Sequence, residues 1–516
     1  MSSPTGIPAA SRVGPSYAAA LAAAMVLYGA TLAPGPLWQD NGLAQVRVLQ
    51  RDLRGDLGLA LSHPLYYALG IAMQALPFAE SAFKTNLVSA VFGAITVANV
   101  FLLLRLWTGH ARAAVIGATA LAVAHTFWQH CTLAEVYTVS TALLTTELLC
   151  LLRYERTRRP AWLILLLLAN GLGVSNHMLA ALNLPCYGVM VLWLARRRQV
   201  RPGLLPALAL AWIAGASLYL GLCIAQIGGG AGLLATARSA LFGETYARNV
   251  LNIVPGRRQL VNSALYLVLN FPTPVLLLAW PGAASLRAAE DRLPRRMLAV
   301  LLAVHVLWAV RYNVPDQYTF FLPAIVLLGV VIGLGADRFL QRRDGRWAIA
   351  MTAGAVLPAL LYVPLPTAAR AMKLDIGATR ELPYRETYSF FLHPWKTGYR
   401  GAERFAREVH DTLPEGSLLI ADSTAVRPLH YRQLTGQWRR RVRVWPPPHA
   451  GEGVGPLREA DLRPELAAGR VYVVSPRPGY CPPWLLAHYE FEEAWPVYRV
   501  REQDEARPVD HPAGTR

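Results

Sequence analysis

Charged residues are scarce in this sequence. They account for 16% of the 516 residues, whereas hydrophobic residues account for 54%. A soluble globular domain is usually about 25% charged. The shortage coincides with long apolar segments, such as residues 206–222, that approach the roughly 20 residues needed to cross a bilayer. These features exclude an ordinary soluble protein and predict a polytopic membrane protein.

Motifs for nucleotides and structural metals are missing. The sequence has no His-x-x-x-His or Cys-x-x-Cys spacing, and the glycine run at 228–230 has neither a strand before it nor a lysine after it. The few cysteines show no metal or disulfide spacing: Cys131, Cys150, Cys186, Cys223 and Cys481. The net charge of +18 does not indicate a nucleic-acid partner, because much of the arginine lies in short clusters between apolar segments.

The apolar segments predict about eleven transmembrane helices. We place them at residues 17–33, 85–105, 113–128, 134–152, 161–175, 178–195, 204–225, 261–281, 297–311, 318–336 and 347–364. The first of these, which follows Arg12, is expected to be an uncleaved span rather than a signal peptide.

The loops between the predicted spans alternate between two classes. One class is rich in arginine and comprises residues 153–159, 196–201, 287–296 and 338–346, with a sparser loop between Arg105 and Arg112. Arginine-rich loops mark the cytoplasmic side of a membrane protein. The N-terminus is therefore expected in the cytoplasm and the C-terminal part outside it.

The composition changes after Pro366. Residues 367–516 are rich in charge, proline and aromatic residues, and residues 417–421 and 471–475 are short strand-like runs. A helical stretch at 424–434 follows the first run, and the chain is expected to be disordered from about Gln503. The predicted fold is an all-α polytopic membrane domain at 1–366, followed by a small extracytoplasmic α/β domain at 367–516.

The first outer loop carries two candidate site residues. Asp40 lies a few residues after the first span, where its carboxylate is either a general base or the N-cap of the following helix. His63 precedes Pro64, so it either starts a helix or binds a phosphate or a proton near the membrane surface. The apolar stretch at 64–78 is too short for a span and is expected to be interfacial or re-entrant.

Three other outer turns also carry polar residues. Glu135 starts a predicted span. Its carboxylate is there either because the helix dipole stabilises it or because it faces a cavity of the bundle. Asn176 and His177 form a short turn between two apolar helices and are either structural or catalytic. Arg311 is suited to phosphate oxygens or to lipid headgroups, and Asp316 is its possible neutralising partner.

Taken in order, these elements resemble one known family. It is the bacterial group related to the animal protein O-mannosyltransferase of receptor ectodomains, within the GT-C glycosyltransferase superfamily. The residues that carry the resemblance are Gln39-Asp40-Asn41-Gly42, His63-Pro64-Leu65-Tyr66-Tyr67, the stretch Lys84 to Gly93, Phe127-Trp128 with Ala134-Glu135-Val136-Tyr137, Ser175-Asn176-His177, and Val314-Pro315-Asp316 with Phe321-Leu322-Pro323. Asn41 and Leu43 stand where the family tends to have serine and glutamate, so a second carboxylate beside Asp40 is missing.

The resemblance implies a function and a set of site residues. It implies a bacterial inner-membrane enzyme that uses a polyprenyl-phosphate sugar as donor and a protein or glycan as acceptor, with a divalent metal left open. Asp40 would be the general base, and Glu135 and His177 would line or orient the pocket. Substrate-binding roles would fall to His63, Tyr66, Lys84, Tyr137, Asn176, Arg311 and Asp316, with Lys84, Arg311 or His63 holding the donor phosphate.

Two other function classes remain open at this stage. A transporter or flippase of a lipid-linked or polar solute would also place polar residues at helix ends, but it predicts inverted repeats, and we find no internal repeat. A non-catalytic membrane assembly protein could use the outer domain as a binding module.

Overall fold

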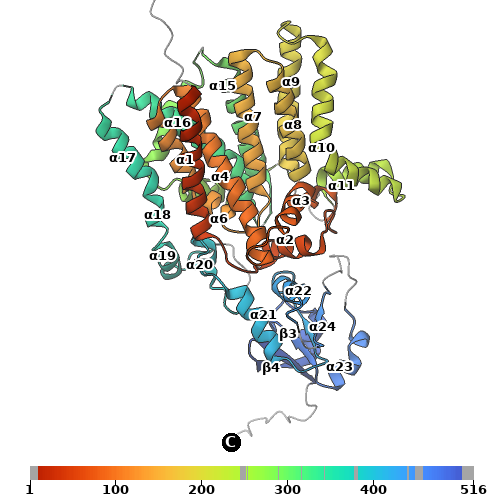
Figure 1. Cartoon of the computed structure of the whole chain (residues 1–516). Coiled ribbons are helices and arrows are strands. Elements are labelled where there is room, and N and C mark those ends of the chain that lie inside the picture. The colour runs from red at the N-terminus through yellow and green to blue at the C-terminus, as the bar shows by residue number, and fades with distance from the viewer. Residues whose placement is uncertain are drawn as a thin grey trace, which may run out of the picture. The chain divides into compact units, whose positions relative to one another are not determined.

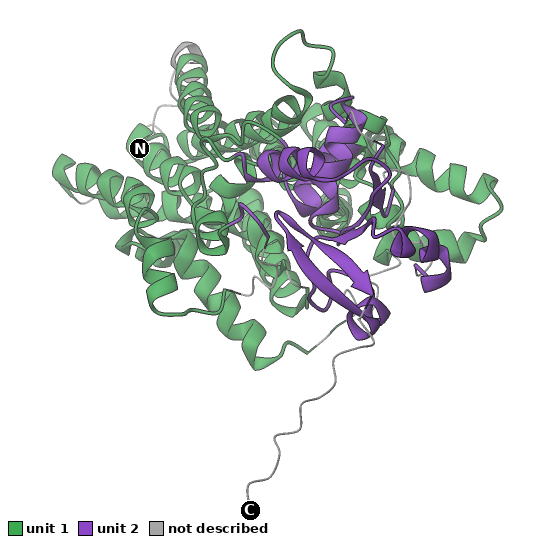
Figure 2. Cartoon of the chain, turned by 90° about the horizontal axis from the view of Figure 1, so that it is seen from below, with its two compact units in different colours: residues 1–35, 47–381, 386–399 green, residues 36–46, 382–385, 400–516 purple. Residues whose placement is uncertain are grey.

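The computed structural model describes residues 10–243, 252, 254–288, 290–314, 316–341, 343–376, 382–438, 441–447 and 457–502. The chain divides into two compact units, which Figure 2 shows in two colours. Unit 1 comprises residues 1–35, 47–381 and 386–399, and unit 2 comprises residues 36–46, 382–385 and 400–516. The predicted disorder from Gln503 lies outside the described residues. The predicted division at residue 366 stays a prediction.

Unit 1 consists of helices (Figure 1). One helix, α2 (Gln39–Gln50), begins in unit 2 and ends in unit 1. The other helices of unit 1 are α1 (Ala10–Thr31), α3 (Pro64–Met73), α4 (Ser81–Thr108), α5 (Ala111–Ala122), α6 (His125–Cys131), α7 (Tyr137–Thr157), α8 (Ala161–Asn176), α9 (Asn183–Arg196), α10 (Leu205–Gly228), α11 (Leu233–Phe242), α13 (Arg257–Asn270), α14 (Ala279–Ser285), α15 (Arg292–Arg311), α16 (Leu322–Leu340), α17 (Gly345–Val356), α18 (Pro358–Leu361), α19 (Leu365–Ala371) and α20 (Thr387–Leu392).

Many of these helices can cross a membrane. Within the described ranges, five are long and apolar enough on their own, and the number rises to as many as eight if each bent helix pair is one span. The five are Ser81–Thr108, Met178–Arg196, Pro202–Gly228, Arg292–Arg311 and Gln317–Leu340. The predicted spans at 17–33, 134–152 and 161–175 overlap the helices α1, α7 and α8, none of which is long and apolar enough by this measure. The chain is thus a multi-pass membrane protein with the predicted mostly helical fold.

Two predicted spans are not continuous helices and a third bends at its end, which corrects the sequence analysis. The span at 113–128 bends by 71° between α5 and α6, and the span at 261–281 bends by 104° after α13. The segment at 347–364 continues past its predicted end and bends by 54° before α19. Proline explains the latter two, because Pro272, Pro274 and Pro364 lack the N–H that continues a helix. Hydropathy alone does not register such a break.

Small residues allow two of the helices to approach closely. In unit 1, α8 packs along α10 (Figure 1). A Cβ added to Gly215 would lie 2.3 Å from the backbone oxygen of Leu168, and one added to Gly171 would lie 2.2 Å from that of Trp212. Only glycine fits at these two positions, as is typical where transmembrane helices meet through their backbones.

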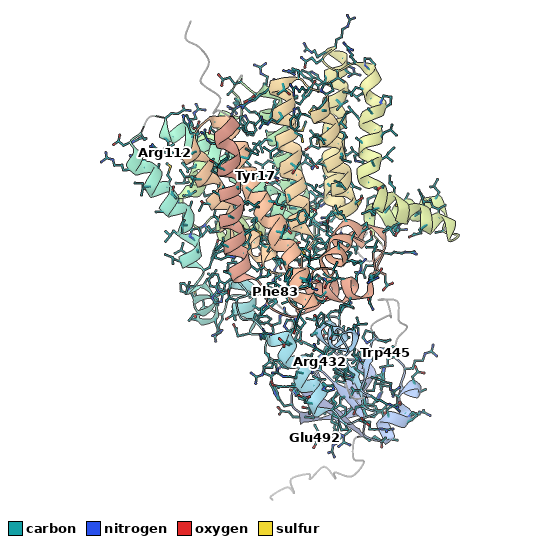
Figure 3. The ribbon with its side chains drawn as sticks, in the orientation of Figure 1. Tyr17, Phe83, Arg112, Arg432, Trp445 and Glu492 are labelled. Carbon is teal, nitrogen blue, oxygen red and sulfur yellow. The ribbon has the colours of Figure 1, made fainter. Side chains whose placement is uncertain are left out.

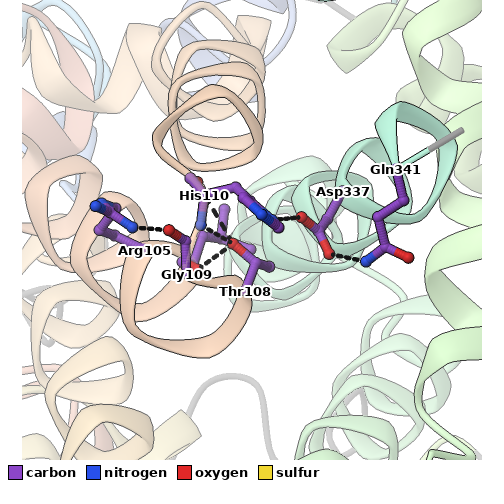
Figure 4. Close-up of polar contacts among 7 residues, drawn as sticks. Arg105, Thr108, Gly109, His110, Asp337 and Gln341 are labelled. Carbon is purple, nitrogen blue, oxygen red and sulfur yellow. Dashed lines mark hydrogen bonds and ion pairs between the residues drawn. The ribbon is translucent and has the colours of Figure 1, made fainter. Parts of the chain in front are cut away.

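The arginine-rich loops meet at one end of unit 1. His110, after α4, lies 2.7 Å from the carboxylate of Asp337 at the end of α16 (Figure 4). Arg156, at the end of α7, pairs at 2.6 Å with Asp291, which precedes α15. Figure 3 shows Arg112 at this end of unit 1 and Phe83, in the first turn of α4, at the opposite end. The two loop classes of the sequence therefore occupy opposite ends of the bundle.

Unit 2 contains the predicted small α/β domain. Its five-stranded sheet has the order β2-β1-β3-β5-β4, with β1 parallel to β2 and β3 and with β4 and β5 forming an antiparallel hairpin. The strands are β1 (Leu418–Ile420), β2 (Arg443–Trp445), β3 (Val471–Val473), β4 (Tyr489–Ala494) and β5 (Val497–Glu502). The helices are α21 (Gly401–Thr412), α22 (Val426–Leu434), α23 (Arg463–Ala467) and α24 (Pro483–His488). Both predicted strands and the predicted helix at 424–434 are present.

Candidate functional site

Asp40 lies in the first turn of α2, one residue after the helix begins at Gln39. A carboxylate in this position is favoured by the positive end of the helix dipole. The side chain keeps contact with solvent. The protein around it nevertheless raises the pKa of Asp40 by desolvation, and the positive charge of Arg427 opposes that rise. An accessible carboxylate with a raised pKa has the properties of a general base.

The residues next to Asp40 are held by hydrogen bonds and a ring contact within unit 2. The backbone N–H of Gln39 donates to the backbone oxygen of Thr424 at 3.2 Å. The ring of Trp38 lies 5.3 Å from that of Phe405 on α21, and only 1% of Trp38 is exposed. The backbone N–H of Leu37 donates to the side-chain oxygen of Gln45 at 2.9 Å. The C-terminal domain thus supports the helix turn that carries the candidate base.

Two predicted histidines come together in unit 1. The rings of His63 and His177 stack with their centroids 4.8 Å apart. The ring nitrogen Nδ1 of His63 donates to the backbone oxygen of Asn176 at 2.9 Å, because a carbonyl only accepts. Nδ1 of His177 accepts the backbone N–H of Leu179 at 3.0 Å. Burial, with a smaller effect of the nearby charge of Arg47, lowers the pKa of His63 to about 4, so its ring is neutral at pH 7.

Tyr137 joins this histidine pair to the later hinge of the chain. Its ring lies 5.0 Å from that of His177 and 5.8 Å from that of Phe320. Its hydroxyl accepts a hydrogen bond from Thr319 at 3.2 Å, and the charges of Asp316 and Glu135 both act on it. The structure therefore brings His63, Glu135, Tyr137, His177 and Asp316 into one region of unit 1. Pro315, within the same hinge, lies outside the described residues.

Tyr66 connects α3 to the backbone of Glu135. The Tyr66 hydroxyl lies 3.3 Å from the hydroxyl of Ser89, which donates to the backbone oxygen of Glu135 at 3.0 Å. The backbone N–H of Glu135 donates to the same Ser89 oxygen at 2.9 Å. Ser89, in the family-like stretch 84–93, thus fixes the loop from which the Glu135 carboxylate projects.

The described hydrogen bonds of Asn176 and Lys84 go to neighbouring segments of unit 1. The amide nitrogen of Asn176 donates to the backbone oxygen of Val136 at 2.8 Å and to the hydroxyl of Ser140 at 2.7 Å, which ties the end of α8 to the start of α7. The ammonium of Lys84 donates to the backbone oxygens of Gln74 and Leu76 at 3.2 and 3.1 Å. These bonds hold the turn after α3, so a phosphate would have to share the Lys84 ammonium with them.

Arg311 points toward the loop before α13. Its guanidinium donates to the backbone oxygen of Asn252 at 2.6 Å and lies 4.1 Å from the centre of the Trp308 ring. The ring of Tyr312, the next residue, lies 4.4 Å from that of Phe320, which also contacts His177. Arg311 is therefore linked to the histidine pair through a chain of aromatic rings.

The predicted convergence of Asp40 with Glu135, His177 and Arg311 stays a prediction, because Asp40 belongs to unit 2 and the other three belong to unit 1.

A divalent metal was left open by the sequence analysis. Among the residues that the structure describes, no group of three or more His, Cys, Asp and Glu side chains is placed to hold one.

One residue that shapes this region escapes the sequence analysis. Arg47, on α2, is only 5% exposed. Its guanidinium donates to the backbone oxygen of Ser62 at 3.0 Å, pairs with Asp52 at 3.2 Å and lies 3.7 Å from the centre of the Tyr67 ring. Arg47 thus fixes the loop that ends at His63. Its position outside the arginine-rich loops is the only sequence signal that could have singled it out.

A second buried polar cluster lies deeper in the bundle. The carboxylate of Glu147 on α7 accepts hydrogen bonds from Asn170 at 3.2 Å, Asn183 at 3.0 Å and Tyr187 at 2.7 Å. The side-chain oxygen of Asn183 in turn accepts Nε2–H of His305 at 2.9 Å. The sequence signal was present, since Glu147 is the only acidic residue in the middle of an apolar segment.

Comparisons with known proteins agree with the predicted family. Residues 61–200 match the family model of the N-terminal domain of the protein O-mannosyl-transferase TMEM260. The range includes most of the predicted site residues: His63, Tyr66, Lys84, Glu135, Tyr137, Asn176 and His177. The resemblance inferred from the motifs is thereby confirmed over this range. No curated protein sequence matches the chain.

Two solved structures are similar to the chain. ArnT from Cupriavidus metallidurans, crystallised with undecaprenyl phosphate bound, aligns over 95% of this chain and 98% of its own, with a TM-score of 0.56 and 14% identity. The oligosaccharyltransferase of Archaeoglobus fulgidus aligns over 77% of this chain and 56% of its own, with a TM-score of 0.42 and 15% identity. The likeness to ArnT confirms the predicted GT-C type of fold.

Proposed function

We propose that this chain, a membrane glycosyltransferase whose residues 61–200 belong to the TMEM260 family, transfers a sugar from a polyprenyl-phosphate donor to an acceptor hydroxyl. Transfer takes place on the non-cytoplasmic side of a bacterial inner membrane, with the N-terminus in the cytoplasm and the α/β domain outside. Asp40 is the general base.

The observation that carries this proposal is the family match over residues 61–200, because it spans the histidine pair, Tyr137 and Glu135. The donor class is supported by ArnT, whose fold the chain shares and which was solved with undecaprenyl phosphate bound. The side of the membrane is supported by the arginine-rich loops, which gather at the end of unit 1 away from these residues.

In the proposed reaction, the acceptor oxygen attacks the anomeric carbon of the donor sugar. The bond from that carbon to the phosphate oxygen breaks, and its electron pair stays on the polyprenyl phosphate. The acceptor proton passes to the Asp40 carboxylate, assistance that contributes about 10² to 10⁴ in rate. A cation close to the departing phosphate stabilises the charge that develops on it.

We assign the remaining roles with the support of the described contacts. His63 is neutral at pH 7, so it offers a donor phosphate a hydrogen bond and no charge. Arg311 keeps its charge at any working pH. It is the stronger candidate for the cation that stabilises the departing phosphate, since Lys84 already donates to two carbonyls. Glu135, His177, Tyr137, Asn176, Tyr66 and Asp316 line and orient the region for the sugar.

A transfer assay on the purified full chain in lipid vesicles tests the proposal. The donors are radiolabelled mannosyl and glucosyl polyprenyl phosphates, and the matched control is Asp56→Asn, an exposed aspartate of the same loop. We expect Asp40→Asn to lower transfer by about 10² to 10⁴ while Asp56→Asn retains the wild-type rate. If a well-folded Asp40→Asn variant transfers sugar at the wild-type rate, Asp40 is not the general base. A folded wild-type chain that consumes neither donor would contradict the function itself.

A further inference from the structure

Arg427 packs directly against the helix turn that carries Asp40. It lies in the first turn of α22 and is half-buried. A Cβ added to Gly42 would lie 2.7 Å from the Cβ of Arg427 and 2.3 Å from the backbone oxygen of Leu37. Any residue larger than glycine at position 42 would push α22 away. The glycine therefore permits close contact between the backbone of α2 and the base of the Arg427 side chain.

The same face of unit 2 holds Asp40 at a second point. Gln39, immediately before Asp40, donates its backbone N–H to Thr424, three residues before Arg427. The positions on either side of the candidate base are thus both fixed by the chain segment at 424–427.

We propose that Arg427 is a positioning residue for Asp40, which holds the carboxylate at a fixed place in the first turn of α2. The inference rests on the proposed function, since it gives Asp40 the role of base. It extends that function because the C-terminal α/β domain would then contribute to catalysis by positioning the base.

The positive charge of Arg427 opposes the effect of burial on Asp40. Desolvation raises the pKa of Asp40, and Arg427 is the described charge that lowers it. Two other charged groups on the packed elements, Asp422 and Arg404, have their own partners. Asp422 accepts the backbone N–H groups of Thr424 and Ala425, each at 3.2 Å. Arg404 on α21 pairs with Glu408 at 2.8 Å.

The pH dependence of transfer by the full chain tests the proposal. The variants are Arg427→Gln, Arg427→Lys, and Arg407→Gln as a matched control, since Arg407 is an exposed arginine of α21. In Arg427→Gln we expect the acidic limb of the rate profile to move upward by about one pH unit, with the rate recovering at higher pH. Arg427→Lys should restore most of the wild-type limb, and Arg407→Gln should leave it unchanged.

A uniform loss of rate in Arg427→Gln at every pH, with the limb at its wild-type position, would indicate a purely structural role and overturn the proposal. Hydrogen exchange of the amides at 37–46 provides a readout that does not depend on activity. We expect faster exchange there in Arg427→Gln, and unchanged exchange would also overturn the proposal. A wild-type chain that is inactive with every donor would contradict the proposed function, while the exchange result would still report whether Arg427 holds this turn.

Discussion

The rings of His63 and His177 stack at a centroid distance of 4.8 Å, and each ring has a fixed tautomer. His63 carries its proton on Nδ1, bound to the backbone oxygen of Asn176, while Nδ1 of His177 accepts a backbone N–H. Two imidazolium rings in this arrangement would repel each other. The pair therefore joins the loop before α3 to the end of α8 only while it remains neutral.

This arrangement predicts that acid weakens the folded state. The pKa of His63 falls from its usual 6.5 to about 4 because of burial, so between these values the unfolded chain binds more protons than the folded chain. The stabilisation is complete above pH 6.5 and is lost as the pH falls toward 4. We expect the melting temperature in detergent to drop across this window, and to drop less in His63→Asn, whose amide keeps a donor.

The control for the acid effect is His488→Asn, which replaces an exposed histidine of α24. That variant should follow the wild-type curve. If His63→Asn shows the same acid sensitivity as the wild type, then His63 does not titrate as its burial requires.

Glu147 is expected to stabilise the helix bundle. Replacing it with leucine leaves Asn170, Asn183 and Tyr187 without their acceptor, and each buried unpaired donor costs about 1 to 3 kcal/mol. We expect Glu147→Leu to lower the free energy of unfolding in detergent by several kcal/mol. Glu155→Gln, on the same helix, removes only an ion pair near the surface and should cost less than about 1 kcal/mol. Equal effects of the two variants would be inconsistent with the cluster.

The backbone contact between α8 and α10 predicts a strong position effect for glycine substitutions. Gly215→Leu forces the two helices apart, because even a Cβ would lie 2.3 Å from the oxygen of Leu168. Overpacking of this kind costs about 1 to 3 kcal/mol. A Cβ added to Gly221, on the same helix, would meet no atom within 4 Å, so Gly221→Leu should be tolerated. Thermal unfolding of the two variants tests this: a lower melting temperature in Gly215→Leu than in Gly221→Leu indicates a tightly packed interface, and equal melting temperatures would contradict it.

The loop classes predict which residues face the outside of the cell. In a background with its five cysteines replaced by alanine, we expect an impermeant maleimide to label Asp56→Cys in intact cells. Arg159→Cys, in an arginine-rich loop, should be labelled only after permeabilisation. Labelling of position 159 in intact cells would reverse the topology and remove the proposed side of transfer.

Much of the fold could be read from the sequence because apolar length and arginine position act locally. The predicted spans at 85–105 and 204–225 coincide with α4 and α10, and the strand-like runs at 417–421 and 471–475 contain β1 and β3. The bends after α5 and α13 were missed, since a hydropathy window averages over the few residues that break a helix. The bonds from Lys84 to the turn after α3 and from Arg47 to Ser62 could not be predicted for another reason, because their acceptors are backbone oxygens that no side-chain pattern encodes.

The sequence by itself determined that this protein is a multi-pass membrane protein, which family its motifs resemble, and which residues stand at the helix ends opposite the arginine-rich loops. These properties depend on composition and order along the chain. Only the tertiary structure decided that His63 stacks on His177 and that residues 36–46 pack with the C-terminal domain through Gly42 and Arg427. Such contacts join residues far apart in the chain, and close packing selects them only after the helices have taken their places.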